Sequence, residues 1–204
     1  KNTGTMGLAA GFSLHPLKNL NVWGDAGVVV TNDDEMYRKL CLIRNHGMKN
    51  RDEISVLGYN SRLDSVQAIV GNWLIKDTRQ ITDRRIANAA IYDAAFSKLS
   101  QYIRLPEKRE GVQQVYHLYM FRVNKALRND LVKYLLDNGV DAKIHYPIPL
   151  YQQEGLKYLG YAPGTFPETD RQSDEVVSLP VDQHLERSQI YYAIETVTNF
   201  FKRL

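Results

Sequence analysis

The sequence predicts an α/β protein built from two units, residues 1–104 and 105–204. The first observation is a β-branched run framed by glycines, "AGVVVT", which is typical of a strand. The second is a long helical region with an apolar stripe. The third is a change of pattern past Leu105-Pro106, where strand and helix patterns alternate over short distances. With 204 residues and 44% hydrophobic content, the chain has enough apolar material for a packed core.

The first unit opens with two expected strands, residues 11–14 and 26–31, joined by a loop that carries Lys18. Asn32 or Asp33 is then expected to cap a helix, because acidic residues fill the first turn. The apolar face of this helix carries Met36, Leu40 and Ile43, and its end is expected at Gly47.

A second helical region is expected after a polar loop, with "SRLD" at residues 61–64 as a capping box. The region is expected to continue to about Leu99, with a break near Asp77 or Thr78. Its apolar residues recur at helical spacing: Val66, Ile69, Val70, Trp73 and Leu74.

The second unit predicts a small α/β layer. Residues 114–123 are expected to form a strand, residues 129–138 a helix that stops at Gly139, and "DAKIHYP" at 141–147 a short strand. Residues 188–204 are expected to close the chain as a helix. Its stripe is Ile190, Ile194, Val197, Phe201 and Leu204.

Composition narrows the possible partners. A net charge of +3, from 26 basic and 23 acidic residues, gives no electrostatic case for nucleic acid. Cys41 is the only cysteine, so no intrachain disulfide and no C-x-x-C zinc site can form, and no metal is expected. No apolar run approaches the ~20 residues of a membrane span, and no signal-peptide pattern opens the chain. A reducing cytoplasm fits best, and the start "KNTGTMGLAAG", which lacks an initiator Met, suggests a piece of a longer protein.

The stretch "FSLHPLKNLNVWGDAGVVVTND" contains Lys18, which is a candidate nucleophile. A lysine that forms an imine must lose its proton near neutral pH and must be held in place. Pro16 restricts the backbone just before it, and Gly24 and Gly27 permit a tight path into the strand. Ser13, at the end of the preceding strand, offers a hydroxyl for a phosphate oxygen. The alternative is a solvated lysine in an ordinary connection, the commoner outcome for a lone lysine in a loop.

The same stretch resembles the lysine segment of the DegT/DnrJ/EryC1/StrS family, the sugar aminotransferases that depend on pyridoxal phosphate. The family pattern, roughly S-F-x-P-x-K-N-L-x-x-x-G-[DE]-[GA]-G followed by V-V-T-N-[DS], is met except that Leu14 replaces the usual phenylalanine. Further segments agree in order and spacing over essentially the whole chain: "RNHG", "GYNSRLDSVQA", "KIHYPIPLY" and "DEVVSLPV".

The resemblance implies a fold type I aminotransferase, with part of a large domain and its mixed sheet in residues 1–104 and a small C-terminal α/β domain in 105–204. It implies that Lys18 forms the internal aldimine with pyridoxal 5'-phosphate and that Ser13 contacts the cofactor phosphate. It also implies that Asn60 reaches the phosphate of the neighbouring subunit's cofactor, hence a homodimer with shared active sites. Three residues match family positions near the cofactor or substrate: His15, Arg62 and His145.

The residues alone leave other roles open for these three. His15 also fits a hydrogen-bonding group at a strand end, Arg62 a surface charge at a helix start, and His145 a half-buried strand histidine. His117 is interpreted as structural. Trp23 suits either the sugar site or packing.

The resemblance further implies that an N-terminal half supplies the aspartate that pairs with the cofactor's ring nitrogen, and that this aspartate precedes Lys1. Asp25 is no substitute, since it matches a loop position after the lysine. The expected reaction moves an amino group from glutamate to a keto group of a nucleotide-linked sugar, with Lys18 also acting as general acid and base.

Two other functions remain open at this point. The first is a pyridoxal-phosphate-dependent sugar dehydratase, which Lys18 disfavours because such relatives have histidine at that position. The second is a truncated, non-catalytic relative that acts as a binding or regulatory scaffold.

Overall fold

The structure, a computed structural model, describes residues 1–204 and divides into two compact units, Lys1–Arg79 and Gln80–Leu204. The division falls inside helix α3 (Thr78–Phe96). It separates compact parts of this chain and does not assign the domains of a longer protein. The domain boundary near residue 104 therefore stays a prediction.

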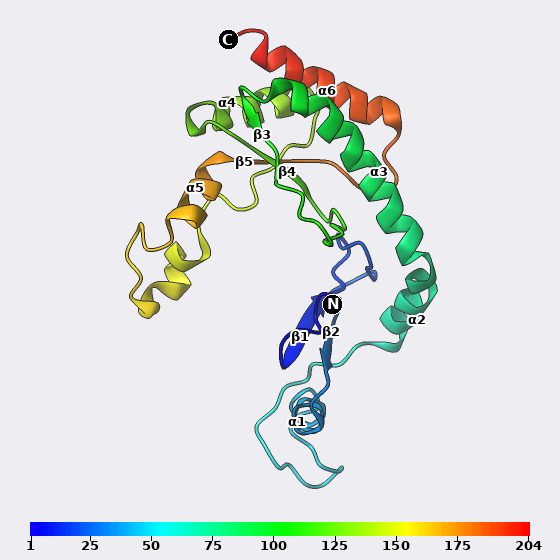
Figure 1. The fold of residues 1–204 in the computed structure, drawn as a ribbon. Coiled ribbons are helices and arrows are strands. Elements are labelled where there is room, and N and C mark those ends of the chain that lie inside the picture. Colours follow the sequence, from blue (N-terminus) through cyan, green and yellow to red (C-terminus); the bar gives the residue numbers. More distant parts are fainter. The chain divides into compact units, whose positions relative to one another are not determined.

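The first unit is built on an antiparallel hairpin of β1 (Ala9–Ser13) and β2 (Gly27–Thr31), which correspond to the two strands expected at residues 11–14 and 26–31. Ala9 lies opposite Thr31 and Ser13 lies opposite Gly27. This pair is the only sheet in the unit, so its pairing is purely antiparallel. The connection at residues 14–26 leaves the hairpin at one end, and helix α1 follows the other end (Figure 1).

Helix α1 (Asp34–Ile43) begins where the sequence predicts. Asp33 is the N-cap, and its carboxylate accepts a hydrogen bond from the backbone N–H of Met36 at 2.6 Å. The helix ends four residues before Gly47, which lies in a turn with φ of +73°. A Cβ at Gly47 would lie 1.6 Å from the carbonyl oxygen of Val56, so this turn requires glycine.

The predicted capping box at residues 61–64 is wrong. Helix α2 (Ser65–Leu74) starts after it, and its N-cap, Asp64, makes no side-chain capping bond. The backbone N–H of Ser61 donates instead to the carbonyl of Arg44 at 2.9 Å, and Asn60 pairs with Asn45 in a β-bridge. These pairings hold the segment extended against the end of α1, so the helix cannot begin there.

The predicted break in the long helical region is confirmed by the 3₁₀ turn η1 (Ile75–Asp77), which precedes α3. A second 3₁₀ turn, η2 (Ser97–Leu99), ends the region at the predicted residue. The apolar stripe of α2 packs only in part, because Val70 is its one buried member. Val70 joins Leu14 and Val22 in the small core cluster of this unit.

The second unit holds an antiparallel sheet in the order β3-β4-β5, formed by β3 (Ile103–Arg104), β4 (Tyr119–Val123) and β5 (Val176–Leu179). β4 is shorter than the predicted strand at 114–123. The carbonyls of Tyr116 and His117 accept hydrogen bonds from Arg85, and Tyr116 has a φ of +44°, so the backbone before β4 turns away from the ladder.

The predicted strand at 141–147 is also wrong. Only Lys143 pairs there, in an isolated bridge with Ser178 of β5. Helix α4 (Lys125–Asp137) begins before the predicted residue 129, because the Asn124 side chain caps it by accepting from the N–H of Ala126. Gly139, with φ of +75°, follows its end as predicted.

Helix α6 (Arg187–Phe201) closes the chain and ends before Leu204, which is exposed. Tyr119, Phe121 and Val123 of β4 are buried in a core that residues of α3, α4 and α6 complete. These elements are labelled in Figure 1. The largest fully buried side chains of this core are Tyr92, Tyr119, Phe96, Phe121, Leu131, Leu135, Ile190, Val177 and Val197.

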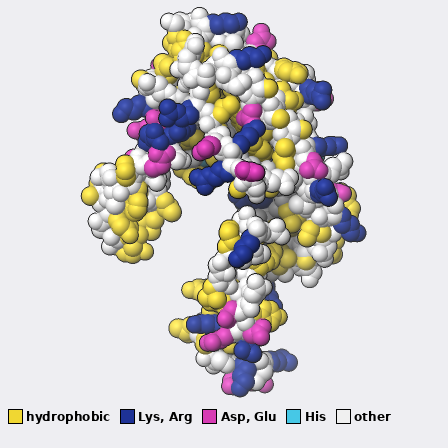
Figure 2. Space-filling view, viewed as in Figure 1, with side chains coloured by type: hydrophobic (Ala, Val, Ile, Leu, Met, Phe, Trp, Pro, Cys, Tyr) yellow, Lys and Arg dark blue, Asp and Glu magenta, His cyan; other side chains and the backbone are white.

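The segment before β5 forms the 3₁₀ turns η3 (Leu150–Gln152) and η4 (Glu154–Leu159) and helix α5 (Pro167–Glu175), none of which the sequence predicted. The Tyr151 hydroxyl donates to the Asp170 carboxylate at 2.7 Å, which ties the turns to the helix. Hydrophobic side chains gather over these turns on the face seen in Figure 2. The exposed ones are Leu150, Tyr158, Leu159, Tyr161 and Phe166. No helix is both long and apolar enough to cross a membrane.

Candidate functional site

The loop that carries Lys18, residues 14–26, is closed at its base by backbone hydrogen bonds. The N–H of Leu14 donates to the carbonyl of Ala26 at 2.9 Å, and the N–H of Val22 donates to the carbonyl of Leu14 at 3.0 Å. The backbone of Leu14, at the start of the loop, thus bonds both to its middle at Val22 and to its end at Ala26. The loop is therefore a fixed structure attached to the end of the hairpin.

Lys18 lies in a tight turn within this loop. Its backbone N–H donates to the carbonyl of His15 at 2.8 Å, and its carbonyl accepts from the side-chain amide of Asn21 at 2.9 Å. The Lys18 residue is half-buried. Because the backbone is bonded on both sides, the Cα position of Lys18 is set.

The loop is also attached to helix α2, through contacts that are remote in sequence. Val22 is 1% exposed and packs in the cluster with Leu14 and Val70. Next to it, the backbone N–H of Trp23 donates to the Gln67 side-chain oxygen at 2.8 Å. A Cβ at Gly24 would lie 2.9 Å from the Gln67 side-chain nitrogen, so glycine at 24 leaves room for that amide.

Ser13 is the last residue of β1, and His15 follows it in the loop, three residues before Lys18. The exposed Ser13 hydroxyl accepts from the His15 N–H at 3.3 Å. The His15 Nδ1 accepts from the Leu17 N–H at 3.2 Å, and its Nε2 faces the Asp25 carboxylate at 4.0 Å. His15 thus does act as a hydrogen-bonding group at a strand end, and Asp25 is an exposed loop residue.

Asn60 and Arg62 lie in a different segment, the connection between α1 and α2. The Arg62 guanidinium donates to the Asn60 side-chain oxygen at 3.1 Å and to the Asn45 side-chain oxygen at 3.0 Å. Arg62 is therefore more than a surface charge at a helix start. The Asn60 oxygen accepts this bond, and the exposed Asn60 side chain also carries an NH₂ group, the kind of donor that a phosphate oxygen accepts from.

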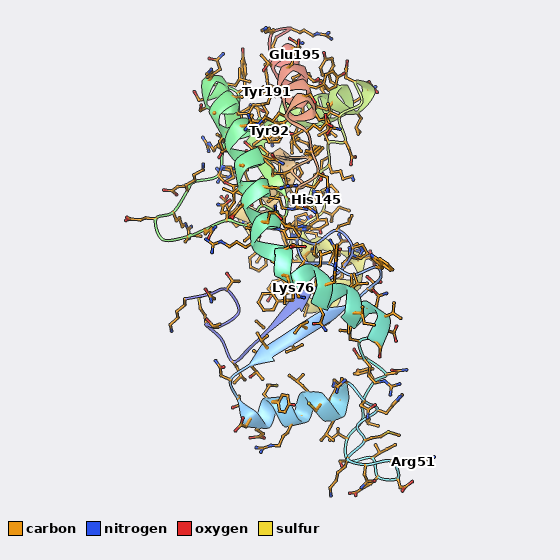
Figure 3. The ribbon with its side chains drawn as sticks, turned by 90° about the vertical axis from the view of Figure 1, so that its right-hand side faces the viewer. Arg51, Lys76, Tyr92, His145, Tyr191 and Glu195 are labelled. Atoms are coloured by element: carbon orange, nitrogen blue, oxygen red, sulfur yellow. The ribbon has the colours of Figure 1, made fainter.

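His145 lies in the second unit and is labelled in Figure 3. Its Nδ1 lies 2.9 Å from the Ser178 hydroxyl oxygen. Burial, with a smaller contribution from Lys143, lowers the pKa of His145 below its ordinary value. The residue is not part of a regular strand, since the only pairing nearby is the Lys143–Ser178 bridge.

His145 also lines a pocket of about 510 Å³ that lies wholly within the second unit. None of the side chains that line it is an acidic residue, a lysine or an arginine. They are Met120, His145, Tyr146, Pro147, Ile148, Pro149, Leu150, Gln153, Thr169, Gln172, Ser173 and Val176.

The structure also places two other residues considered from the sequence, Trp23 and His117. Trp23 is 79% exposed, so its ring packs in neither core cluster of this chain. His117 is half-buried, and its carbonyl accepts from Arg85. No group of three or more His, Cys, Asp or Glu side chains is placed to hold a metal ion.

Sequence reasoning missed the residues that hold the candidates in place. Gln67, Asn45 and Ser178 each bond a loop to a distant element. Gln67 is a polar residue next to the apolar stripe of α2, a weak signal of a specific bond. Asn45 and Ser178 carry no such signal, because their partners lie in other segments.

The comparisons with known proteins agree over nearly the whole chain. The model of the DegT/DnrJ/EryC1/StrS aminotransferase family matches residues 1–198. A Streptomyces venezuelae protein named dTDP-3-amino-3,4,6-trideoxy-alpha-D-glucose transaminase is 35% identical over 197 residues, which cover 96% of this chain and 51% of that protein.

Two solved structures have the same fold. The S. venezuelae protein DesV, in complex with a ketimine intermediate, is 33% identical with a TM-score of 0.90 over 97% of this chain and 53% of that one. NtdA from Bacillus subtilis, with the bound cofactor PMP, is 26% identical with a TM-score of 0.90 over 99% of this chain and 48% of that one. The fold of the chain is thus that of about half of a fold type I aminotransferase, and it spans about half the length of the curated relatives it matches.

Proposed function

Because the chain belongs to the DegT/DnrJ/EryC1/StrS aminotransferase family, we propose that its full-length protein transfers an amino group from glutamate to a keto group of a nucleotide-linked sugar. The observation that carries the proposal is the fixed loop around Lys18. Backbone bonds on both sides of Lys18 and the packing of Val22 hold the backbone of the residue that matches the lysine of the family pattern.

The residues of this loop fit pyridoxal 5'-phosphate by their chemistry. The cofactor presents an aldehyde and a phosphate. The loop carries the Lys18 amine, and the end of β1, five residues earlier in the chain, carries the exposed Ser13 hydroxyl. Lys18 would hold the cofactor and Ser13 would donate to its phosphate. When bound, this cofactor draws electrons from the substrate carbon that loses a proton.

The Lys18 Nζ would take that proton and return it to the product. A general base of this kind must reach two positions while its backbone stays in place. The turn around Lys18 meets the second need, since its backbone bonds hold the backbone of this residue in place. A lysine on a loosely held loop would lose the proximity that such a proton transfer needs.

The proposal includes a homodimer. Asn60 and Arg62 lie in the connection between α1 and α2, where both pair with Asn45 just after α1. Helix α1 itself follows the hairpin end opposite the Lys18 loop (Figure 1). Asn60 is also exposed, and its side-chain NH₂ group is a hydrogen-bond donor. A role for Asn60 at the cofactor phosphate of a second copy fits this placement, with Arg62 orienting its side chain. A cytoplasmic location and roles for His15 and His145 near the substrate complete the proposal.

The test uses the full-length protein with pyridoxal phosphate, glutamate and a panel of keto-sugar nucleotides, with products identified by mass. Replacement of one sugar keto oxygen by an amino group is the expected product. K18R should abolish turnover, because a guanidinium neither forms the imine nor loses its proton near neutral pH. K39R, a matched change on the exposed side of α1, should leave turnover intact.

Other outcomes of the same assay would contradict the proposal. A sugar product that has lost water instead of gaining nitrogen would indicate a dehydratase. Amino transfer that survives K18R would remove Lys18 from the mechanism. No product with any sugar, from protein that is folded and contains the cofactor, would favour a binding or regulatory role.

A further inference from the structure

Resting on the proposed function, we propose that Ser178 is a positioning residue for His145. The Ser178 hydroxyl holds the His145 ring by Nδ1, so that Nε2 is left for an uncharged polar group of the sugar in the adjoining pocket.

Ser178 is well suited to hold another side chain because its own position is fixed from both sides. In β5 it pairs with Met120 of β4. On the other edge its N–H donates to the carbonyl of Lys143 at 2.8 Å, and its carbonyl accepts from the Lys143 N–H at 3.0 Å. The residue is 3% exposed. Its hydroxyl therefore starts from a backbone that has little freedom to move.

His145 is different, because it lies in coil two residues after the Lys143 bridge and is only half-buried. Without a bond to β5 its ring would have several orientations available. The 2.9 Å contact between Nδ1 and the Ser178 oxygen selects one of them. In a neutral imidazole one nitrogen donates and the other accepts, so the role that Nδ1 takes toward the Ser178 hydroxyl is coupled to the opposite role of Nε2 toward the pocket.

The pocket beside His145 favours a neutral, hydroxyl-bearing ligand. Its wall of Pro147, Ile148 and Pro149 is apolar, whereas Gln153 and Gln172 provide amide groups that both donate and accept. A sugar ring combines apolar C–H faces with hydroxyl edges and carries no charge. Burial lowers the pKa of His145, which favours the neutral ring that such a ligand would meet.

The first test measures the ring itself. The full-length protein with bound pyridoxal phosphate, labelled with ¹⁵N-histidine, is compared with S178A, S178T and S173A, and H145Q identifies the His145 signals. S178A should change the ratio of the two His145 tautomers, and S178T, which restores a hydroxyl, should return it toward the original. S173A removes a hydroxyl that lines the same pocket but bonds within α5, to the carbonyl of Thr169, and should leave the ratio unchanged.

The second test measures how S178A changes the rates of the two half-reactions, the one with the keto sugar and the one with glutamate. In S178A the kcat/KM for the keto sugar should fall by about fivefold to tenfold, the range expected for one hydrogen bond. The reaction with glutamate alone should keep its rate. S178C replaces the hydroxyl by a slightly larger thiol, which forms only weak hydrogen bonds, and gives the same comparison if S178A does not fold.

The proposal is overturned if S178A leaves the His145 tautomers unchanged, or if S173A shifts them equally. It is also overturned if S178A slows the glutamate reaction as much as the sugar reaction. These results are distinct from a failure of the proposed function, in which the unaltered protein would transfer no amino group while the tautomer ratio would still report on Ser178.

Discussion

Replacing Val22 by alanine tests whether packing against α2 holds the Lys18 loop. Val22 is 1% exposed and lies in the three-residue cluster with Leu14 and Val70. The change removes two buried methyl groups, worth about 1.6 kcal/mol at roughly 0.8 kcal/mol each. The void left in so small a cluster adds to this, so we expect a loss of about 2 kcal/mol in the free energy of unfolding.

The matched control is V197A in α6, which makes the same change at a site that is 0% exposed in the core of the second unit. Urea denaturation of the full-length protein should give similar losses for both variants. Amide hydrogen exchange separates them, because only V22A should speed exchange at the bonded N–H groups of Lys18 and Val22. Equal exchange at these amides in V22A and V197A would refute the role of Val22 as the anchor of the loop.

Two further predictions concern the second unit. Arg85 is 5% exposed, and it donates to the Gln183 side chain and to the carbonyls of Tyr116 and His117. R85A should lower the free energy of unfolding by about 3 kcal/mol, because it leaves these acceptors unpaired. A loss below about 1 kcal/mol in urea denaturation would contradict this prediction. The folded-state pKa of His145 lies below its ordinary value of 6.5, mainly through burial, so protonation favours the unfolded chain. The stability linked to His145 should be complete above pH 6.5 and should be lost as the pH falls through the lower folded-state pKa. H145Q should flatten this part of the curve of unfolding free energy against pH. An unchanged slope in H145Q would count against the lowered pKa of His145.

Local signals in the sequence predicted the elements whose ends depend on neighbouring residues. The cap at Asp33, the acidic first turn of α1 and the break at residues 75–77 all follow from short-range chemistry, and the structure confirms them. The fold class itself follows from the resemblance and is confirmed by the solved structures.

Pairings between distant segments account for the errors. The motif at residues 61–64 has the residues of a capping box, but Ser61 bonds to Arg44 and the segment stays extended. The run before β4 has strand-forming residues, but Arg85 takes the carbonyls of Tyr116 and His117. A single sequence gives no information on such partners.

In the candidate site, too, local features were predictable from the sequence and contacts between distant segments were not. Pro16, Gly24 and Gly27 indicate a constrained loop around Lys18, and the loop is indeed closed by backbone bonds. Its attachment to Gln67, 44 residues beyond Trp23, was not predictable from local sequence. The cofactor and substrate roles of Ser13, His15, Asn60, Arg62 and His145 remain predictions.

The most direct test of the central claim locates the cofactor on the chain. The full-length protein is loaded with pyridoxal phosphate, treated with borohydride to make a lysine–cofactor link permanent, digested, and its peptides are analysed by mass spectrometry. We expect the added mass of the reduced cofactor on Lys18 alone, and none on this peptide in K18R. Modification of a different lysine, or an unmodified Lys18 in protein that retains the cofactor, would contradict the account.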